Sequence, residues 1–205
     1  KEKSMENDIE FKRRKEITKA LRILYERMSF GEITIKEIGQ ITPFGRTSIY
    51  NYYQNKEEIF LSLMTEEYNF WRNDVEKINK KNDLSKKEFV DLFSKSLQKR
   101  CILLKLLSMN LYDIEMHARD KELLIFKEAY HDMIETIRHS LVKFFGYGKK
   151  EQDEILFSFF PFLFGIYPYT HISTKQREAL NKLGIDRREF SIYELTSRFM
   201  NKILN

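Results

Sequence analysis

The sequence predicts an all-α protein in which an N-terminal three-helix bundle is joined by a long helix to a larger helical C-terminal domain. Apolar residues recur along the chain at spacings of three and four, as they do on one face of a helix. Several expected helix starts carry a serine, threonine or asparagine three residues before a glutamate, which is the pattern of a capping box. The 205 residues include only 7 Gly and 3 Pro, and strand-type alternation is hard to find.

The first helix is expected from about Asn7 to Ser29. One face of this helix is an apolar stripe of Ile17, Leu21, Leu24 and Met28. The other face is basic and carries Lys12, Arg13, Lys15, Lys19 and Arg22. This helix is therefore amphipathic, with a charged side left for solvent or for a partner.

Two short helices are expected next. Thr34 caps the first of them, and Glu37 reaches back to complete the capping box. Pro43 and Gly45 break that helix after about two turns. The second runs over residues 46–53, with Ile49 and Tyr53 four residues apart on its inner face. A basic helix followed by two short helices and a tight turn is the layout of a helix-turn-helix unit.

A long helix opens at a cap formed by Asn55 and Glu58 and ends in the polar stretch 79–83. Its apolar stripe is Phe60, Met64, Tyr68, Trp71, Val75 and Ile78. Further helices are expected over about 85–97, 99–112, 120–145, 155–169, 173–183 and from there to about 204. We expect two domains, residues 7–56 and residues 57–205.

Composition limits the class of protein. Hydrophobic residues make up 42% of the chain and aromatic residues 14%, which excludes a disordered chain. The net charge is +5, and residues 1–56 hold 12 Lys+Arg against 8 Asp+Glu, a balance of +4. A solvated basic face and a phosphate-binding face both explain this excess. A single cysteine, Cys101, and a charged segment 1–16 without an apolar stretch favour the cytoplasm.

No catalytic machinery is visible. The chain has no Gly-rich phosphate loop and no nucleophile elbow. The histidines are not spaced as metal ligands are; they are His117, His131, His139 and His171. We therefore expect neither an enzyme nor a metal site or cofactor.

Hydrogen-bond donors are concentrated on the segment 46–56. Arg46 stands at the start of the second short helix, where a guanidinium reaches base edges or phosphate. Polar groups on the outer faces of this helix are Thr47, Ser48 and Asn51. Tyr50 and Tyr52 offer phenolic donors to phosphates beside a groove, and Lys56 adds charge at the start of the next helix. This pattern indicates a surface that binds DNA.

These residues resemble the tetracycline-repressor (TetR) family of bacterial transcription regulators. The resemblance covers residues 13–60 and rests on TIKEIGQ (34–40), RTSIYNYY (46–53) and NKEEIF (55–60). It implies phosphate contacts by Thr34, Tyr50, Tyr52 and Lys56, and base contacts by Gly45, Arg46, Thr47 and Asn51. The full set of expected DNA-binding residues is Thr34, Lys36, Phe44, Gly45, Arg46, Thr47, Ser48, Tyr50, Asn51, Tyr52 and Lys56. The resemblance also implies a homodimer on a near-palindromic double-stranded operator, and a repressor released by a small apolar or aromatic ligand.

The sequence departs from the family pattern at two positions. Gly39 replaces a small alanine, which lowers helix propensity but preserves tight packing. Pro43 replaces the usual turn glycine, and proline cannot adopt a positive φ. The turn before residue 46 must therefore be built in another way.

An apolar segment between Glu154 and Lys175 allows a second interpretation. Its 20 uncharged residues are long enough to cross a bilayer, but prolines and a glycine interrupt them. A buried helix at a dimer interface explains the segment better, with no membrane contact. The candidate interface residues are Phe157, Phe160, Leu163, Phe164 and Tyr167, some of which could instead line the core. The alternative to the regulator is a helical ligand-binding or membrane-associated protein that does not act on DNA.

Overall fold

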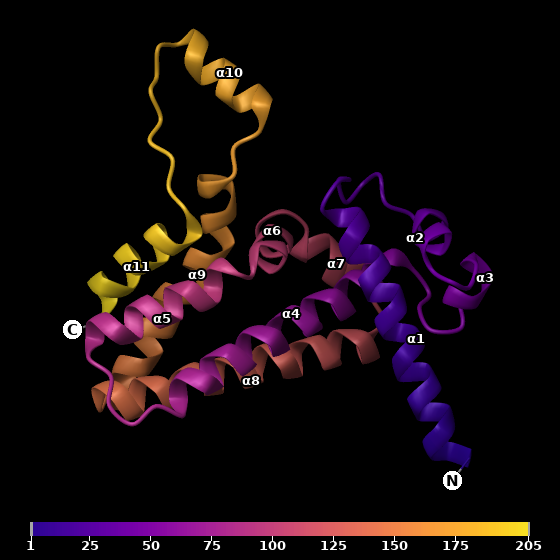
Figure 1. Cartoon of the computed structure of the whole chain (residues 1–205), viewed down its shortest axis with the longest axis horizontal. Helices are drawn as coiled ribbons and strands as arrows, with labels where there is room; N and C mark the ends of the chain where they lie inside the picture. Colours follow the sequence, from indigo (N-terminus) through magenta and orange to yellow (C-terminus); the bar gives the residue numbers. More distant parts are fainter. Residues whose placement is uncertain (1, 205) are drawn as a thin grey trace. The chain divides into compact units, whose positions relative to one another are not determined.

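The described part of the chain is built from helices and their connections, with no strand. The computed structural model describes residues 2–204, and the side chains of residues 8–204. Figure 1 shows the elements, which are α1 (Glu2–Tyr25), α2 (Ile35–Ile41), α3 (Arg46–Ile49), α4 (Lys56–Asn79), α5 (Lys86–Gln98), α6 (Cys101–Met109), α7 (Leu111–His117), α8 (Asp120–Phe145), α9 (Lys149–Thr170), α10 (Thr174–Lys182) and α11 (Ile192–Ile203). The all-α prediction is confirmed.

Backbone packing divides the chain into two compact units. The first unit comprises the chain up to Glu67 together with Asn110–Tyr130. The second comprises Tyr68–Met109 together with the chain from His131 onward. Helices α4 and α8 therefore contribute residues to both units.

In the first unit, α1 packs against α2, and α2 packs against α3 (Figure 1). Ile17 and Leu21 of the predicted stripe are buried, and Tyr25 rather than Met28 completes the stripe. The helix ends at Tyr25, about a turn earlier than expected, and Met28 lies in the turn that follows. Tyr25 packs edge-on against Phe60 of α4, with ring centroids 5.3 Å apart. Burial of such large apolar side chains stabilises this small bundle.

In the second unit, α5 packs against α11 and α6 packs against α9. An aromatic cluster occupies the centre: the ring of Phe93 lies 5.8 Å from Trp71 and 5.4 Å from Phe159. The predicted capping box at the start of α5 is present, because Ser85 and Glu88 bond each other's backbone N–H.

The prediction of a single helix over 99–112 is wrong. The chain breaks at Asn110, whose ψ of −2° at a φ of −138° lies outside the helical region, and this break separates α6 from α7.

Helix α9 begins at Lys149, a turn and a half before the expected start, and continues through Pro161 and Pro168. The first turn is charged, and Glu151 accepts a hydrogen bond from the backbone N–H of Gly148 at 2.7 Å. Of the candidate interface residues, Phe160 and Leu163 are buried within the unit at 6% and 0% exposure, so they belong to its core.

Among the described helices, none alone is both long and apolar enough to span a membrane. Helices α9 and α10 taken together pass those criteria, but the pair is bent by 71° at the break between them.

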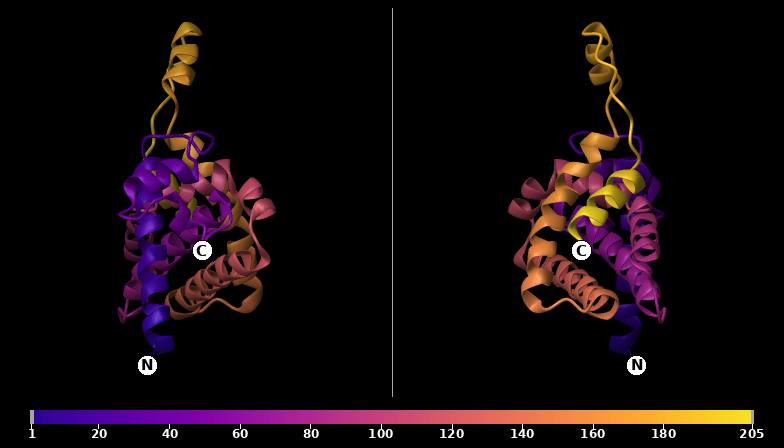
Figure 2. Two further views of the ribbon diagram at one scale, coloured as in Figure 1. Left: turned by 90° about the vertical axis from the view of Figure 1, so that its right-hand side faces the viewer. Right: turned by 90° about the vertical axis from the view of Figure 1, so that its left-hand side faces the viewer.

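Helix α10 lies on an arm, which we define as residues 171–191. Figure 2 shows this arm standing off the rest of its unit when seen from two opposite sides. None of the nine residues of α10 is buried. Contacts within the arm include a capping box between Ser173 and Gln176 and an ion pair between Arg177 and Glu189, and Arg187 donates to the backbone carbonyl of Tyr169 in α9 at 3.1 Å.

Candidate nucleic-acid interface

The turn between α2 and α3 is built without a left-handed residue. Thr42 and Gly45 both have extended backbone, with φ of −75° and −68° and ψ of 150° and 175°. The Thr42 hydroxyl lies 2.5 Å from the carbonyl oxygen of Phe44 and 3.3 Å from that of Gly39, so it is placed to donate to either. Pro43, which fixes a negative φ, fits this extended turn. The structure thus explains how the motif forms without the usual turn glycine.

Gly39 allows α2 and α3 to approach each other closely. A Cβ atom at this position would lie 2.9 Å from the backbone nitrogen of Arg46 and 3.1 Å from its Cα. Neither atom belongs to a flexible side chain, so the start of α3 would have to move. In this chain, then, the position has no room even for the small alanine of the family pattern.

We expect Gly39→Ala to lower the free energy of unfolding by about 1–2 kcal/mol, because overpacking against backbone outweighs the better helix propensity of alanine. Urea denaturation followed by circular dichroism measures this change. Gly31→Ala is the matched control, since a Cβ at Gly31 meets nothing within 4 Å. A Gly39→Ala variant as stable as that control would contradict the close approach.

Helix α3 is shorter than expected. The helix predicted over 46–53 ends at Ile49, and the chain continues as a turn in which the N–H groups of Tyr52 and Tyr53 bond the Ile49 carbonyl at 2.9 and 3.1 Å. Ile49 and Tyr53 are fully buried, as their spacing predicts. Burial raises the pKa of Tyr53 to about 12, so its hydroxyl stays protonated and hydrogen-bonds Ser62 at 3.0 Å.

Most of the expected DNA-binding residues are exposed, and they lie on α2, on the α3 segment and at the start of α4. Those that are exposed are Thr34, Lys36, Gly45, Arg46, Thr47, Tyr50 and Asn51. Those that are half-buried are Phe44, Ser48, Tyr52 and Lys56. A polar outer surface is thus anchored from beneath by Ile49 and Tyr53.

Arg46 and Tyr50 form one group on this surface. The guanidinium Nη2 of Arg46 donates to the hydroxyl of Tyr50 at 3.2 Å, and its Cζ lies 5.6 Å from the centre of the tyrosine ring. The contact is exposed, so solvent screens it and it holds the arginine only weakly. Both side chains therefore remain available to a partner.

Thr34 and Lys56 have intramolecular partners. The Thr34 hydroxyl accepts from the backbone N–H of Lys36 at 3.2 Å and donates to the carboxylate of Glu37. The capping box is therefore incomplete, because Glu37 bonds the hydroxyl and not the backbone of Thr34. The Lys56 ammonium donates to the carbonyl of Phe30 at 2.7 Å and lies over its ring. To contact a phosphate, the Lys56 ammonium would have to break its hydrogen bond to the Phe30 carbonyl, or to donate to the carbonyl and the phosphate at once.

Arg14 of α1, which the sequence alone did not single out, supports the candidate interface from its buried side. Arg14 donates to both carboxylate oxygens of Glu122, at 3.0 and 3.1 Å, and to the backbone carbonyl of Tyr52 at 3.2 Å. Its guanidinium also lies over the ring of Tyr53. Burial acts to lower the pKa of Arg14, but the hydrogen bonds that Arg14 donates to Glu122 and Glu10 and the negative charge of Glu122 help to outweigh this effect, so the pKa is raised. The arginine thus ties α1 and α8 to the end of the α3 turn.

A second ion pair, between Glu58 and Arg119, holds the start of α4. Glu58 is fully buried and accepts from the Arg119 side chain at 2.5 and 2.7 Å. Burial alone would raise the pKa of Glu58, but Arg119 and two backbone N–H donors lower it. Nearby, the Asn55 side chain accepts from the backbone N–H of Glu58 at 3.0 Å and donates to the carbonyl of His117 at 2.8 Å. The Asn55 half of the predicted cap is therefore present and is joined to α7, whereas the Glu58 carboxylate accepts from the backbone N–H of Gln54 and not from that of Asn55.

Within the described residues, no group of three or more His, Cys, Asp or Glu side chains is placed to hold a metal ion. The surface offers guanidinium, amide, hydroxyl and phenol groups, which suit the recognition of phosphates and base edges.

Comparisons with known proteins agree with the fold. A family model described as the C-terminal domain of tetracyclin repressor-like proteins matches residues 65–198. Among solved structures, the chain is similar to the fatty acid degradation regulator FadR from Bacillus halodurans, with a TM-score of 0.61 and 14% identity over 94% of each chain. It is also similar to the MbdR regulator from Azoarcus sp. CIB, with a TM-score of 0.55 and 15% identity over 93% of this chain and 96% of that one. No curated protein matches the sequence. At these identities the structural likeness shows the fold alone.

Proposed function

The chain belongs to the tetracyclin repressor-like family and is a transcriptional regulator, and from this premise we propose that it represses transcription by binding a near-palindromic DNA operator as a homodimer. The DNA-binding domain in this proposal is residues 7–56, and residues 57–205 regulate and dimerise. A small-molecule ligand would lower operator affinity through a coupling between the two sites. The family consists of regulators rather than enzymes, so we propose no catalytic activity, and we place the protein in the cytoplasm.

One observation carries the DNA-binding proposal. The exposed side chains of Arg46, Thr47, Tyr50 and Asn51 lie together on a segment whose inner residues, Ile49 and Tyr53, are fully buried. A rigid segment with a polar outer face is what entry into a major groove requires. The basic excess of residues 1–56 adds favourable, salt-dependent attraction to phosphates.

Selection from random DNA duplexes at about 0.15 M salt tests this function. We expect enrichment of an inverted repeat whose half-sites lie about 34–36 Å apart, or one helical turn. Recovery of no sequence preference would contradict the proposal and favour a helical ligand-binding protein that does not act on DNA.

We propose that an exposed stripe on α9 forms the dimer face. The stripe consists of Phe157, Pro161, Phe164 and Pro168, which follow one another at spacings of four, three and four. Phe157 is 80% exposed and Phe164 is 40% exposed. An apolar stripe of this kind on a helix surface favours contact with an equivalent surface across a two-fold axis.

Phe157→Asp is expected to weaken the dimer about 30-fold or more, because it places a charge in the apolar contact. Sedimentation velocity over a range of protein concentrations measures the change. Tyr112→Asp is the control, since Tyr112 is 76% exposed on α7 and outside the stripe. If both variants dimerise as the original chain does, the dimer face lies elsewhere.

A further inference from the structure

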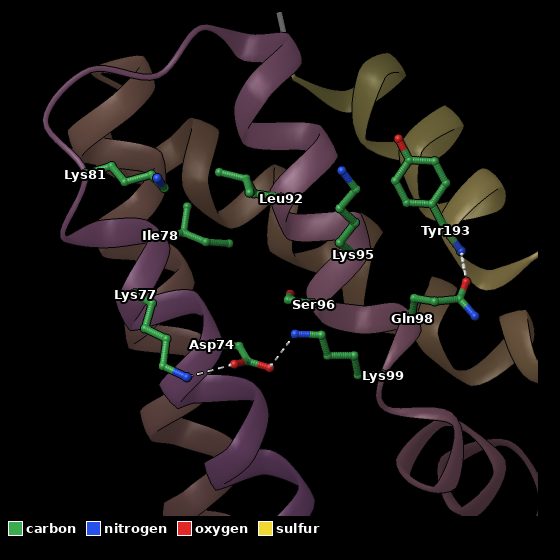
Figure 3. Close-up of a pocket in the computed structure, with 10 residues that line it drawn as sticks. All are labelled: Asp74, Lys77, Ile78, Lys81, Leu92, Lys95, Ser96, Gln98, Lys99 and Tyr193. Carbon is green, nitrogen blue, oxygen red and sulfur yellow. Dashed lines mark hydrogen bonds and ion pairs between the residues drawn. The ribbon is translucent and has the colours of Figure 1, made fainter.

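The second unit contains a groove that the proposed DNA contacts do not use. It lies between the second half of α4, α5 and the start of α11, and its volume is about 680 Å³ (Figure 3). The residues that line it are Asp74, Lys77, Ile78, Lys81, Leu92, Lys95, Ser96, Gln98, Lys99 and Tyr193. This volume lies within the range of sites that bind small molecules.

The groove has an apolar floor. Ile78 of α4 and Leu92 of α5 face each other across it, as Figure 3 shows. Ile78 is buried and Leu92 is half-buried, so an apolar group placed between them would lose contact with water. Ser96 is also buried, and its hydroxyl donates to the carbonyl of Phe93 at 2.7 Å. The floor can therefore hold the body of an aromatic or aliphatic molecule.

The rim of the groove is cationic. Four of the lining residues are lysines, and the only carboxylate among the lining residues is Asp74. Asp74 is shared by three cations: its oxygens lie 3.2 Å from Lys77 Nζ, 3.9 Å from Lys99 Nζ and 3.6 Å from Arg100 Nη2. Lys95 pairs at 2.7 Å with Asp91, which lies outside the lining. Positive charge thus exceeds negative charge around the groove, and a bound anion would relieve the repulsion among the lysines.

We propose that this groove binds an anionic amphiphile, a small molecule with an aromatic or aliphatic body and one carboxylate, phosphate or sulfonate group. The body lies between Ile78 and Leu92, and the lysines of the rim bind the acidic group. Binding of this molecule in the groove does not depend on the proposed function. Its role as the regulatory ligand rests on the proposed function. An acidic group is thereby added to the small apolar or aromatic ligand that the family resemblance implies.

The structure supplies a reporter for this site. Trp71 is the only tryptophan of the chain, and its indole N–H donates to the Ser96 hydroxyl at 3.1 Å. Because Ser96 lines the groove, a bound fluorophore would lie close to the indole. Energy transfer from Trp71 to the fluorophore is therefore expected to be efficient for a dye bound in the groove, and the variants below locate the site of binding.

The test uses 8-anilino-1-naphthalenesulfonate and its uncharged counterpart, N-phenyl-1-naphthylamine, on the full chain without DNA. We expect saturable energy transfer from Trp71 to the sulfonate, with an affinity about tenfold or more above that for the uncharged dye. The Lys77→Gln/Lys81→Gln variant should lose about tenfold in affinity for the sulfonate and little for the uncharged dye. The Lys149→Gln/Lys150→Gln variant removes the same charge at the start of α9 and should bind as the original chain does.

A second variant, Leu92→Asp, places a carboxylate in the groove and should abolish the energy transfer. Thermal melting of each variant checks that it is folded. Equal affinities for the two dyes, or equal affinities of the two double-lysine variants for the sulfonate, would overturn the proposal. Operator binding is measured separately, so loss of the groove site and loss of the DNA-binding function give different results.

Discussion

Replacing Arg14 by methionine is expected to lower the free energy of unfolding by about 3–5 kcal/mol, which is the usual cost of removing one partner of a buried ion pair. The side chain of Arg14 is 22% exposed and that of Glu122 only 3%. Without the guanidinium, the buried Glu122 carboxylate would lose the two hydrogen bonds that it accepts from Arg14, and the carbonyl of Tyr52 would lose a donor. Urea denaturation followed by circular dichroism measures the loss.

The adjacent arginine provides the control. Arg13 has a 40% exposed side chain, and its carboxylate partner is Glu16, one turn further along α1. Arg13→Met should therefore change stability by only about 1 kcal/mol or less. In the double variant Arg14→Met/Glu122→Leu, most of the lost stability should return, because both charges are gone. A double variant no more stable than Arg14→Met would show that Arg14 acts through packing and not through the ion pair.

Arg46→Ala is expected to weaken operator binding by about 1–3 kcal/mol, or roughly 5- to 150-fold, and to relax the preference at one base position. Arg46 is exposed, and its neighbour on the surface is Tyr50, so its removal should leave the fold intact. Fluorescence anisotropy with the selected operator and with single-base variants of it measures both effects.

The pattern of the loss decides the role of Arg46. If Arg46 contacts a phosphate, the variant should lose affinity uniformly across DNA sequences. The slope of log affinity against log salt concentration should then decrease in magnitude by about one. Arg188→Ala removes the same charge from the arm in the second unit and should leave operator affinity within about twofold. An Arg46→Ala variant that binds the operator as tightly as the original chain would remove Arg46 from the interface.

Local patterns predicted the long helices well. Helices α4 and α8 run over Lys56–Asn79 and Asp120–Phe145, as the apolar stripes and end signals indicate. Both are long enough for helical periodicity to dominate, and a capping side chain precedes α4. The end of α3 was not predictable in this way, because the segment Tyr50–Tyr52 is short and its residues have weak helix propensity. There, the burial of Tyr53 decides the path of the chain.

The contacts that support the candidate interface could not be predicted from one sequence. Arg14 and Glu122 are 108 positions apart, and Glu58 and Arg119 are 61 apart. Each of these residues alone is typical of an exposed helix face, and only the fold brings the opposite charges together. The groove beside Ser96 could not be predicted either, because its four lysines lie in or just beyond α4 and α5, two helices that the sequence predicts separately.

In a single chain, few interactions stabilise the helical state of α10. A helix of nine residues is too short to be stable in water through its own backbone bonds, and none of its residues is buried. Leu183 and Ile185, just beyond it, expose their side chains to solvent. Within one chain, the helical state of α10 therefore rests on its capping box and on the exposed ion pair between Arg177 and Glu189, and we expect it to be only marginally stable. Association of a second copy through this arm would make the ellipticity at 222 nm more negative as the protein concentration increases, so it would be detected as a gain of helix as well as a gain of mass.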